Sequence, residues 1–149
     1  MRSPDDRRRG AARGAGRAVA RRGSVDERRR CRRLRRRPRE CFLPDVPLDE
    51  VYLDRAFVTR WLHGVPVSSS SQPAVMAVML EQLEVRPGDH VLEIGAGTGY
   101  NAALLARLVG PRGQVTSVEL DAATADGAAR QLVIAGATRA AVVTADGVL

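Results

Sequence analysis

The stretch Glu93-Ile-Gly-Ala-Gly-Thr-Gly99 decides the fold of this 149-residue chain. A short apolar run at 90–94 leads into it, and an Ala- and Leu-rich segment at 101–109 follows it. A buried strand, a glycine turn and a helix are therefore predicted in that order. Glycine lets the backbone approach a ligand without a Cβ in the way, and the start of the helix supplies oriented N–H donors. The stretch is typical of a loop that binds a nucleotide-like ligand.

The same alternation continues toward the C-terminus. Each predicted strand is followed by a turn and an Ala-rich helical pattern, which is the order of a doubly wound parallel sheet of the α/β class. Residues 87–149 are therefore interpreted as a partial Rossmann-like domain. Its strands are predicted at 90–94, 114–120 and 139–144, and its helices at 101–109 and 122–135.

Two acidic residues have sequence separations from the glycines that indicate which kind of ligand the loop binds. Glu93 lies just before Gly95, and Glu119 lies 24 residues after Gly95 (119 − 95), at the end of the second predicted strand. A carboxylate at that place accepts hydrogen bonds from both ribose hydroxyls of an adenosine. A dinucleotide-binding loop would have its third glycine at the position of Tyr100. The spacing therefore favours an adenosine-containing cofactor without a pyrophosphate, with a purely structural turn as the weaker alternative.

Residues 41–86 are predicted to form a helical segment on the substrate side of the domain. A short helix is expected over 49–57, and the Gly-, Pro- and Ser-containing stretch 64–71 predicts a loop. Apolar residues recur at three and four positions over 75–83, which predicts a second helix. Ser71 is a candidate N-cap for that helix, whose first turn tolerates a proline.

Residues 1–40 differ from the rest of the chain in composition. They hold 17 of the 24 basic residues and 5 of the 17 acids, a net charge of +12 (17 − 5), whereas 41–149 carry −5 (7 − 12). No aromatic side chain lies there, so burial cannot offset the ordering entropy, and we expect a disordered Arg-rich extension. Deletion of 1–38 should therefore leave the fold intact. An Arg tether for nucleic acid is the alternative, but without interleaved aromatics a nucleic-acid partner is not expected.

The composition also argues against a membrane protein, a disulfide-stabilised protein and a metal-binding protein. No apolar run approaches the roughly 20 residues of a membrane span, and the Arg-rich start lacks the apolar stretch of a signal peptide. Cys31 and Cys41 fit neither a disulfide framework nor a metal cluster. His63 and His90 have no partner pattern for a metal. We therefore expect a reducing, cytoplasmic setting, with no membrane and no metal.

The loop that begins at Glu93 resembles the cofactor loop of class I S-adenosylmethionine-dependent methyltransferases. A wider resemblance, to the protein-L-isoaspartate O-methyltransferases, covers roughly residues 38 to 149. It includes Val143-Thr-Ala-Asp146-Gly147, which resembles the family's segment after the third strand, where an acid faces the adenine. The other matching stretches are Phe42-Leu-Pro44, Tyr52 with Asp54, Ser71-Gln-Pro73 and Arg86-Pro-Gly-Asp89-His-Val-Leu-Glu-Ile-Gly95.

This resemblance implies a cofactor, an acceptor and a set of site residues. The cofactor is S-adenosyl-L-methionine, and the acceptor is an isoaspartyl or aspartyl carboxylate of a peptide or protein. Ser71 is implied as the catalytic-site residue that faces the substrate carboxylate and the transferring methyl group. The residues implied to line the cofactor are Glu93, Gly95, Gly97, Gly99, Glu119, Asp146 and Gly147.

Three interpretations of the function remain open. The first is a carboxyl methyltransferase of the protein-repair type. The second is a peptide-tailoring carboxyl methyltransferase, because Val67-Ser-Ser-Ser70 stands where the family usually has a glycine-rich stretch and Thr-Ile. The third is a non-catalytic fragment that binds cofactor or a partner. The family's sheet normally has seven strands and three are predicted here, so we expect a C-terminally truncated sheet, an unpaired first-strand edge and no turnover by the chain as written.

Overall fold

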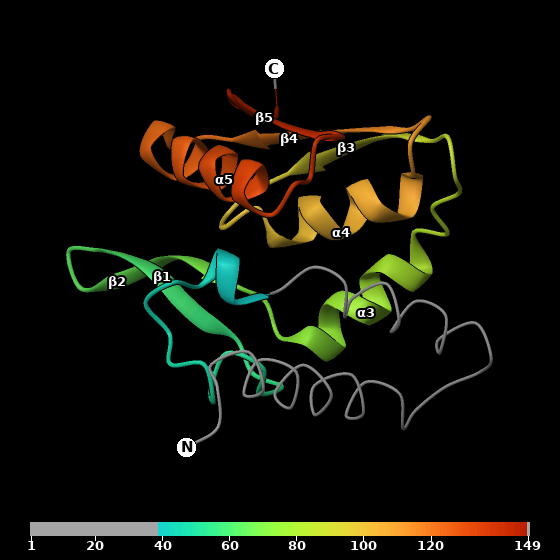
Figure 1. Ribbon diagram of the computed structural model, residues 1–149. Coiled ribbons are helices and arrows are strands. Elements are labelled where there is room, and N and C mark those ends of the chain that lie inside the picture. The colour runs from blue at the N-terminus through green and yellow to red at the C-terminus, as the bar shows by residue number, and fades with distance from the viewer. Residues whose placement is uncertain (1–38, 149) are drawn as a thin grey trace.

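The computed structural model describes residues 39–148, and Figure 1 shows how their helices and strands are arranged. The strands form two sheets, one of two strands and one of three. The elements in chain order are η1 (Arg39–Phe42), β1 (Phe57–Leu62), β2 (Val65–Ser70), α3 (Pro73–Gln82), β3 (His90–Ile94), α4 (Tyr100–Val109), β4 (Gln114–Glu119), α5 (Ala122–Ile134) and β5 (Ala140–Thr144).

The three-stranded sheet is parallel, with the strand order β3-β4-β5. Val91 of β3 lies opposite Val115 of β4, which in turn lies opposite Ala140 of β5. Parallel neighbours need a crossover connection, and α4 and α5 provide one each. The predicted α/β class and its Rossmann-like parallel sheet are therefore confirmed, with each predicted strand and helix of this part found within two residues of its expected ends.

Helices α4 and α5 lie on the same side of this sheet, and η1 and α3 pack beyond α4 (Figure 1). Because α4 is sandwiched in this way, almost all of its side chains are buried. The core joins Leu105 and Val109 of α4 to Val115 of β4, Leu132 of α5 and Phe42 of η1. On the opposite face of the sheet, apolar side chains are exposed, namely Leu92 (64%), Ile94 (59%) and Val143 (45%).

The predicted loop at 64–71 is wrong, because most of it is strand β2. This strand pairs with β1 as an antiparallel hairpin, with Phe57 opposite Ser70 and Leu62 opposite Val65. The two-residue turn consists of His63 (φ 48°) and Gly64 (φ 78°). Positive φ at both central positions is typical of a type I′ turn, whose twist matches that of a hairpin.

The helix predicted over 49–57 is also wrong. Turns and bends occupy 48–55, and β1 begins at Phe57. Helix α3 is confirmed, but its N-cap is Gln72 rather than Ser71, and Pro73 is its first residue. The segment 41–86 is therefore a hairpin followed by one helix, and not a helical segment throughout.

The boundary of the predicted Arg-rich extension is corrected by two residues. Arg39 and Glu40, which were assigned to it, belong to η1, and the Arg39 side chain is buried. Burial of this charged guanidinium is tolerated because its N–H groups donate hydrogen bonds to backbone carbonyls. The predicted disorder of residues 1–38, and Cys31 with it, lies outside the described residues.

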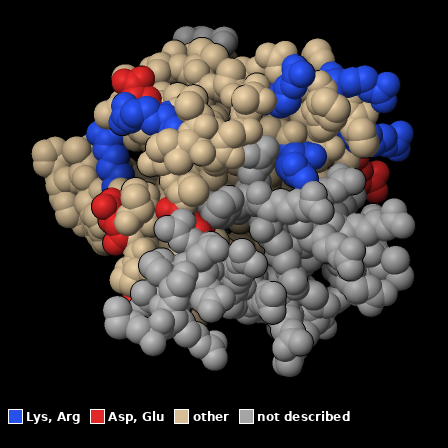
Figure 2. Space-filling view, viewed as in Figure 1, with Lys and Arg blue, Asp and Glu red and all other residues tan. Residues whose placement is uncertain are grey.

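On the face seen in Figure 2, Arg side chains stand in small groups, several of them beside acidic ones. They do not gather into one basic patch on this face of the described part. Among the helices of the described part, none is long and apolar enough to cross a membrane.

Candidate functional site

The glycine loop connects the end of β3 to the start of α4. Its three glycines all have positive φ: 88° at Gly95, 53° at Gly97 and 84° at Gly99. L-residues rarely adopt this region, so the loop depends on glycine for its shape. A Cβ at Gly99 would also lie 3.1 Å from the carbonyl oxygen of Ala128, whereas a Cβ at Gly95 would project into open space. Gly99 therefore allows α5 to pack closely, and Gly95 leaves room above the loop.

Glu119 joins the glycine loop to the end of β4. Its Oε2 accepts a hydrogen bond from the backbone N–H of Gly97 at 3.0 Å, and its Oε1 accepts one from the N–H of Asp121 at 3.3 Å. Two residues that are expected to line the cofactor are thus in contact. This follows from the parallel register, which places Glu93 of β3 opposite Ser117 of β4 and brings both carboxyl ends to one edge.

Asp146 and Gly147 reach the same edge from the end of β5. The N–H of Ala145 donates to the Glu119 carbonyl at 3.0 Å. A Cβ at Gly147 would lie 2.8 Å from two side-chain atoms of Ile94. Gly147 therefore packs on the last residue of β3, and Asp146 is exposed beside it. The structure brings all three chain segments predicted for cofactor binding to one place.

Glu93 lies beneath the glycine loop rather than over it. Its side chain is on the helix-facing side of the sheet, where Oε1 accepts a hydrogen bond from Asn101 Nδ2 at 2.7 Å and Oε2 accepts one from Ser117 Oγ. Burial raises the pKa of Glu93 above its ordinary value of 4.5, and the two hydrogen bonds act in the opposite direction. Glu93 thus ties β3, β4 and α4 together under the loop.

We expect replacement of Glu93 by glutamine to change how stability depends on pH. The pKa of Glu93 is raised in the folded state, so protonation of its carboxylate favours folding. This contribution to stability is fully present below about pH 4.5, the ordinary pKa, and is lost as the pH rises through the raised pKa. From neutral pH downward, the wild type should therefore gain stability relative to Glu93→Gln. Urea unfolding at a series of pH values measures this, and identical pH profiles would contradict it.

Ser71 lies exposed at the junction between β2 and α3. Its carbonyl oxygen accepts a hydrogen bond from Arg39 Nη2 at 2.9 Å. Next to it, Asp54 accepts hydrogen bonds from the N–H of Ala74 at 2.9 Å and from Gln72 Nε2 at 3.2 Å. Asp54 therefore supplies the side-chain hydrogen bond to the first turn of α3 that was predicted for Ser71, although the N-cap position itself is Gln72. The Ser71 hydroxyl is left facing outward, at a junction that is fixed from two sides.

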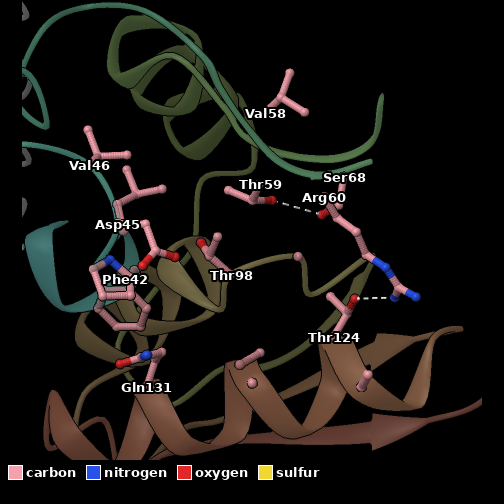
Figure 3. A pocket seen from close by; sticks show the side chains of 16 residues that line it. Phe42, Asp45, Val46, Val58, Thr59, Arg60, Ser68, Thr98, Thr124 and Gln131 are labelled. Atoms are coloured by element: carbon pink, nitrogen blue, oxygen red, sulfur yellow. Dashed lines mark hydrogen bonds between the residues drawn. The ribbon is translucent and has the colours of Figure 1, made fainter. Parts of the chain in front are cut away.

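A groove adjoins the glycine loop on the side of α5 (Figure 3). It has a volume of about 370 Å³, which is within the usual range for small-molecule sites. The hairpin, the segment after η1, the glycine loop and α5 form its walls. Their contributions include Thr59 and Ser68 of the hairpin, Asp45, Thr98 and Gln131.

Arg60 spans this groove from the hairpin to α5, as Figure 3 shows. It forms an ion pair with Asp121 and donates to Thr124 Oγ1 at 3.0 Å. Asp121 also caps α5 by accepting from the N–H of Thr124 at 2.7 Å. This contact between Arg60 and Asp121 is not predicted from the sequence. The acid after the second strand signals a helix N-cap, but nothing local to it identifies Arg60 as its partner. Trp61, beside Arg60, is 61% exposed and takes no part in the core.

Comparison with known proteins adds an independent line of evidence. The family of protein-L-isoaspartate(D-aspartate) O-methyltransferases matches residues 17–149. A protein-L-isoaspartate O-methyltransferase of Thermotoga maritima is 49% identical over 83 residues, which cover 55% of this chain and 26% of that protein. Protein-L-isoaspartate O-methyltransferase 1 of Rhodopseudomonas palustris strain HaA2 is 41% identical over 114 residues, which cover 76% of this chain and 43% of that protein.

Solved structures agree with the sequence relatives. A protein-L-isoaspartate O-methyltransferase superposes with a TM-score of 0.82 at 35% identity, over 91% of this chain and 42% of that one. A putative member from Plasmodium falciparum, solved with S-adenosyl-L-homocysteine, has a TM-score of 0.73 at 16% identity and supports the fold alone. This chain spans about a quarter to a half of the length of its curated relatives. It belongs to the protein-L-isoaspartate(D-aspartate) O-methyltransferase family.

Proposed function

We propose that this chain is an S-adenosyl-L-methionine-dependent carboxyl O-methyltransferase that acts on L-isoaspartyl residues of proteins or peptides. The observation that carries the proposal is the contact between Glu119 and Gly97 at the carboxyl edge of the parallel sheet. This contact brings Glu119, to which we assign the ribose, against the glycine loop, and the chain belongs to a family of methyltransferases. The proposal includes a cytoplasmic setting.

The residues present fit this cofactor. Open space lies over Gly95, where a Cβ would intrude, and the N-terminus of α4 has no side-chain cap at Gly99. The loop therefore leaves room for a ligand, whereas the N–H groups of residues 95–97 already donate to Val118 and Glu119. We assign the ribose to Glu119, the adenine edge to Asp146 and Gly147, and the support of the loop to Glu93. S-adenosyl-L-methionine, when bound, supplies a sulfonium-activated methyl group.

The reaction demands little reactive chemistry from the chain. A carboxylate is already ionised at neutral pH and is itself the nucleophile, so no general base is needed. What the protein contributes is alignment of the carboxylate oxygen and exclusion of water. The outward-facing hydroxyl of Ser71 is suited to orient the carboxylate by one hydrogen bond.

A methyl-transfer assay tests the proposal. The 149-residue chain is given labelled S-adenosyl-L-methionine and either an isoaspartyl peptide or the same peptide with an ordinary aspartate. The proposal predicts binding of S-adenosyl-L-homocysteine by calorimetry and methylation of the isoaspartyl peptide alone, a result that would overturn the absence of turnover expected from the three predicted strands. Preferential methylation of the aspartyl peptide would instead support the tailoring activity, which the serine-rich strand β2 beside the groove favours. Cofactor binding without transfer to either peptide would contradict an enzymatic function and leave a cofactor-binding fragment.

A further inference from the structure

Arg39 is the most deeply buried charged residue of the described part, with 1% of its surface exposed. Its guanidinium donates five hydrogen bonds, and all five acceptors are oxygen atoms of two short segments, 51–55 and 70–71. The acceptors are the carbonyls of Val51 (3.1 Å), Leu53 (3.3 Å), Arg55 (3.4 Å) and Ser71 (2.9 Å) and the hydroxyl of Ser70 (3.5 Å).

These two segments meet at the start of α3, next to Ser71. Arg39 holds the carbonyls at 51, 53 and 55, and Asp54 within the same segment reaches the N–H of Ala74 and the side chain of Gln72. Arg39 also binds the Ser71 carbonyl directly. The junction that carries the Ser71 hydroxyl is therefore fixed by Arg39 along two routes, one direct and one through Asp54.

The same guanidinium also contacts the cofactor side of the site. Its central carbon lies 5.8 Å from the ring centroid of Tyr100 and 5.4 Å from that of Phe57. Cations at such distances are attracted to aromatic rings. Tyr100 is the first residue of α4, directly after the glycine loop, and Phe57 begins β1. Arg39 therefore links the substrate-side junction to the helix that the glycine loop introduces.

The charge of Arg39 is not explained by an ion pair. Within residues 39–148, ion pairs join Arg55 to Glu50 and Arg60 to Asp121, whereas the hydrogen bonds of the Arg39 guanidinium go to carbonyl and hydroxyl oxygens. Burial lowers the pKa of Arg39, although the guanidinium remains charged. An apolar side chain would fill such a space at a lower desolvation cost. The benefit of an arginine here is its rigid set of donors, which fixes several acceptors at once.

We propose that Arg39 is a positioning residue that fixes the Ser71 junction relative to the glycine loop, and so aligns the acceptor carboxylate for methyl transfer. The second half of this inference rests on the proposed function, whereas the first half concerns the chain alone. Arg39 stands at the end of an Arg-rich run and contacts no reacting atom. It acts through the backbone carbonyl of Ser71.

Hydrogen exchange measured by mass spectrometry tests the structural half. The full chain is compared with Arg39→Met, Arg39→Lys and the matched control Arg55→Met, whose guanidinium also lies over the Phe57 ring but is exposed. In Arg39→Met, amides at 51–55 and 70–76 should exchange at least about tenfold faster while those of β4 change little. Arg39→Lys keeps the charge with fewer donors and should give a smaller increase in the same places.

An equal increase in all segments, or none, would overturn the inference, because Arg39 would then be a general packing residue or dispensable. If Arg39→Met does not fold, Arg39→Lys carries the same test, with the same two segments expected to respond. The control Arg55→Met should leave 70–76 unchanged, and a matching response there would also overturn the inference.

Kinetics test the functional half. Loss of alignment should lower kcat on the isoaspartyl peptide by at least about tenfold, with a smaller change in KM, and Arg39→Lys should recover part of kcat. The stoichiometry and affinity of S-adenosyl-L-homocysteine binding should stay unchanged, which separates misalignment from a loss of folded protein. A fall in kcat that only matches a fall in binding stoichiometry would overturn the role in alignment. Absence of turnover in the wild type would contradict the proposed function, and the exchange experiment would still decide the structural half.

Discussion

Replacement of Glu119 by alanine is expected to weaken binding of S-adenosyl-L-methionine by at least about tenfold, because each charge-assisted hydrogen bond to a ribose hydroxyl contributes roughly 1.5–3 kcal/mol. The substitution also removes the acceptor of the Gly97 and Asp121 N–H groups, so the loop loses its link to the end of β4. Isothermal calorimetry with S-adenosyl-L-homocysteine measures the affinity directly and needs no turnover.

The matched control for this change is Asp126→Ala. Asp126 is an acid on the exposed face of α5, so its removal changes the net charge equally without touching the carboxyl edge of the sheet. We expect its affinity to equal that of the wild type. If Glu119→Ala bound the cofactor as tightly as this control does, Glu119 would not hold the ribose.

Replacement of Gly113 by alanine is expected to lower the free energy of unfolding by about 3 kcal/mol, the upper part of the range for overpacking. A Cβ there would lie 2.6 Å from the Asp89 carbonyl oxygen and 2.4 Å from Val109 Cβ. The Asp89 oxygen cannot move freely, since it also accepts the N–H of Gln114 at 3.1 Å. Urea unfolding followed by circular dichroism gives the difference.

For Gly127→Ala we expect the opposite change in the free energy of unfolding. Gly127 lies inside α5, and a Cβ there would meet only the end of the flexible Arg130 side chain, at 4.0 Å. Alanine in a helix interior should therefore raise the free energy of unfolding by about 0.5–1 kcal/mol. Equal effects of the two alanines would show that local space does not govern these positions.

The parallel part of the fold could be predicted because its signals are local. The run that ends in Glu93-Ile-Gly-Ala-Gly-Thr-Gly99 marks a strand, a turn and a helix start within a few residues, and the structure places them as expected. The hairpin could not be predicted in this way. Serines occupy much of β2, so the strand has little apolar pattern, and its pairing depends on the turn at His63 and Gly64.

Arg39 shows a second limit of sequence interpretation. Its partners lie 12 to 32 residues further along the chain, and most of them are backbone carbonyls, which no residue type reveals. Composition therefore assigned it to the Arg-rich extension. Glu93 is predicted to line the cofactor, but the sequence could not show on which side of the sheet its carboxylate lies. Side-chain direction depends on the strand register, which tertiary packing sets.

The register of the parallel sheet has a consequence for how the chain folds. Val91 and Val115 are 24 residues apart (115 − 91), and Val115 and Ala140 are 25 apart (140 − 115). The entropy lost on closing a loop grows only with the logarithm of its length, so pairing β3 with β4 and pairing β4 with β5 cost nearly the same entropy. The hairpin closes over a much shorter distance, from Leu62 to Val65. Strands β2, β4 and β5 thus each pair with a strand that was synthesised shortly before, so sheet formation can keep pace with the ribosome, one strand at a time.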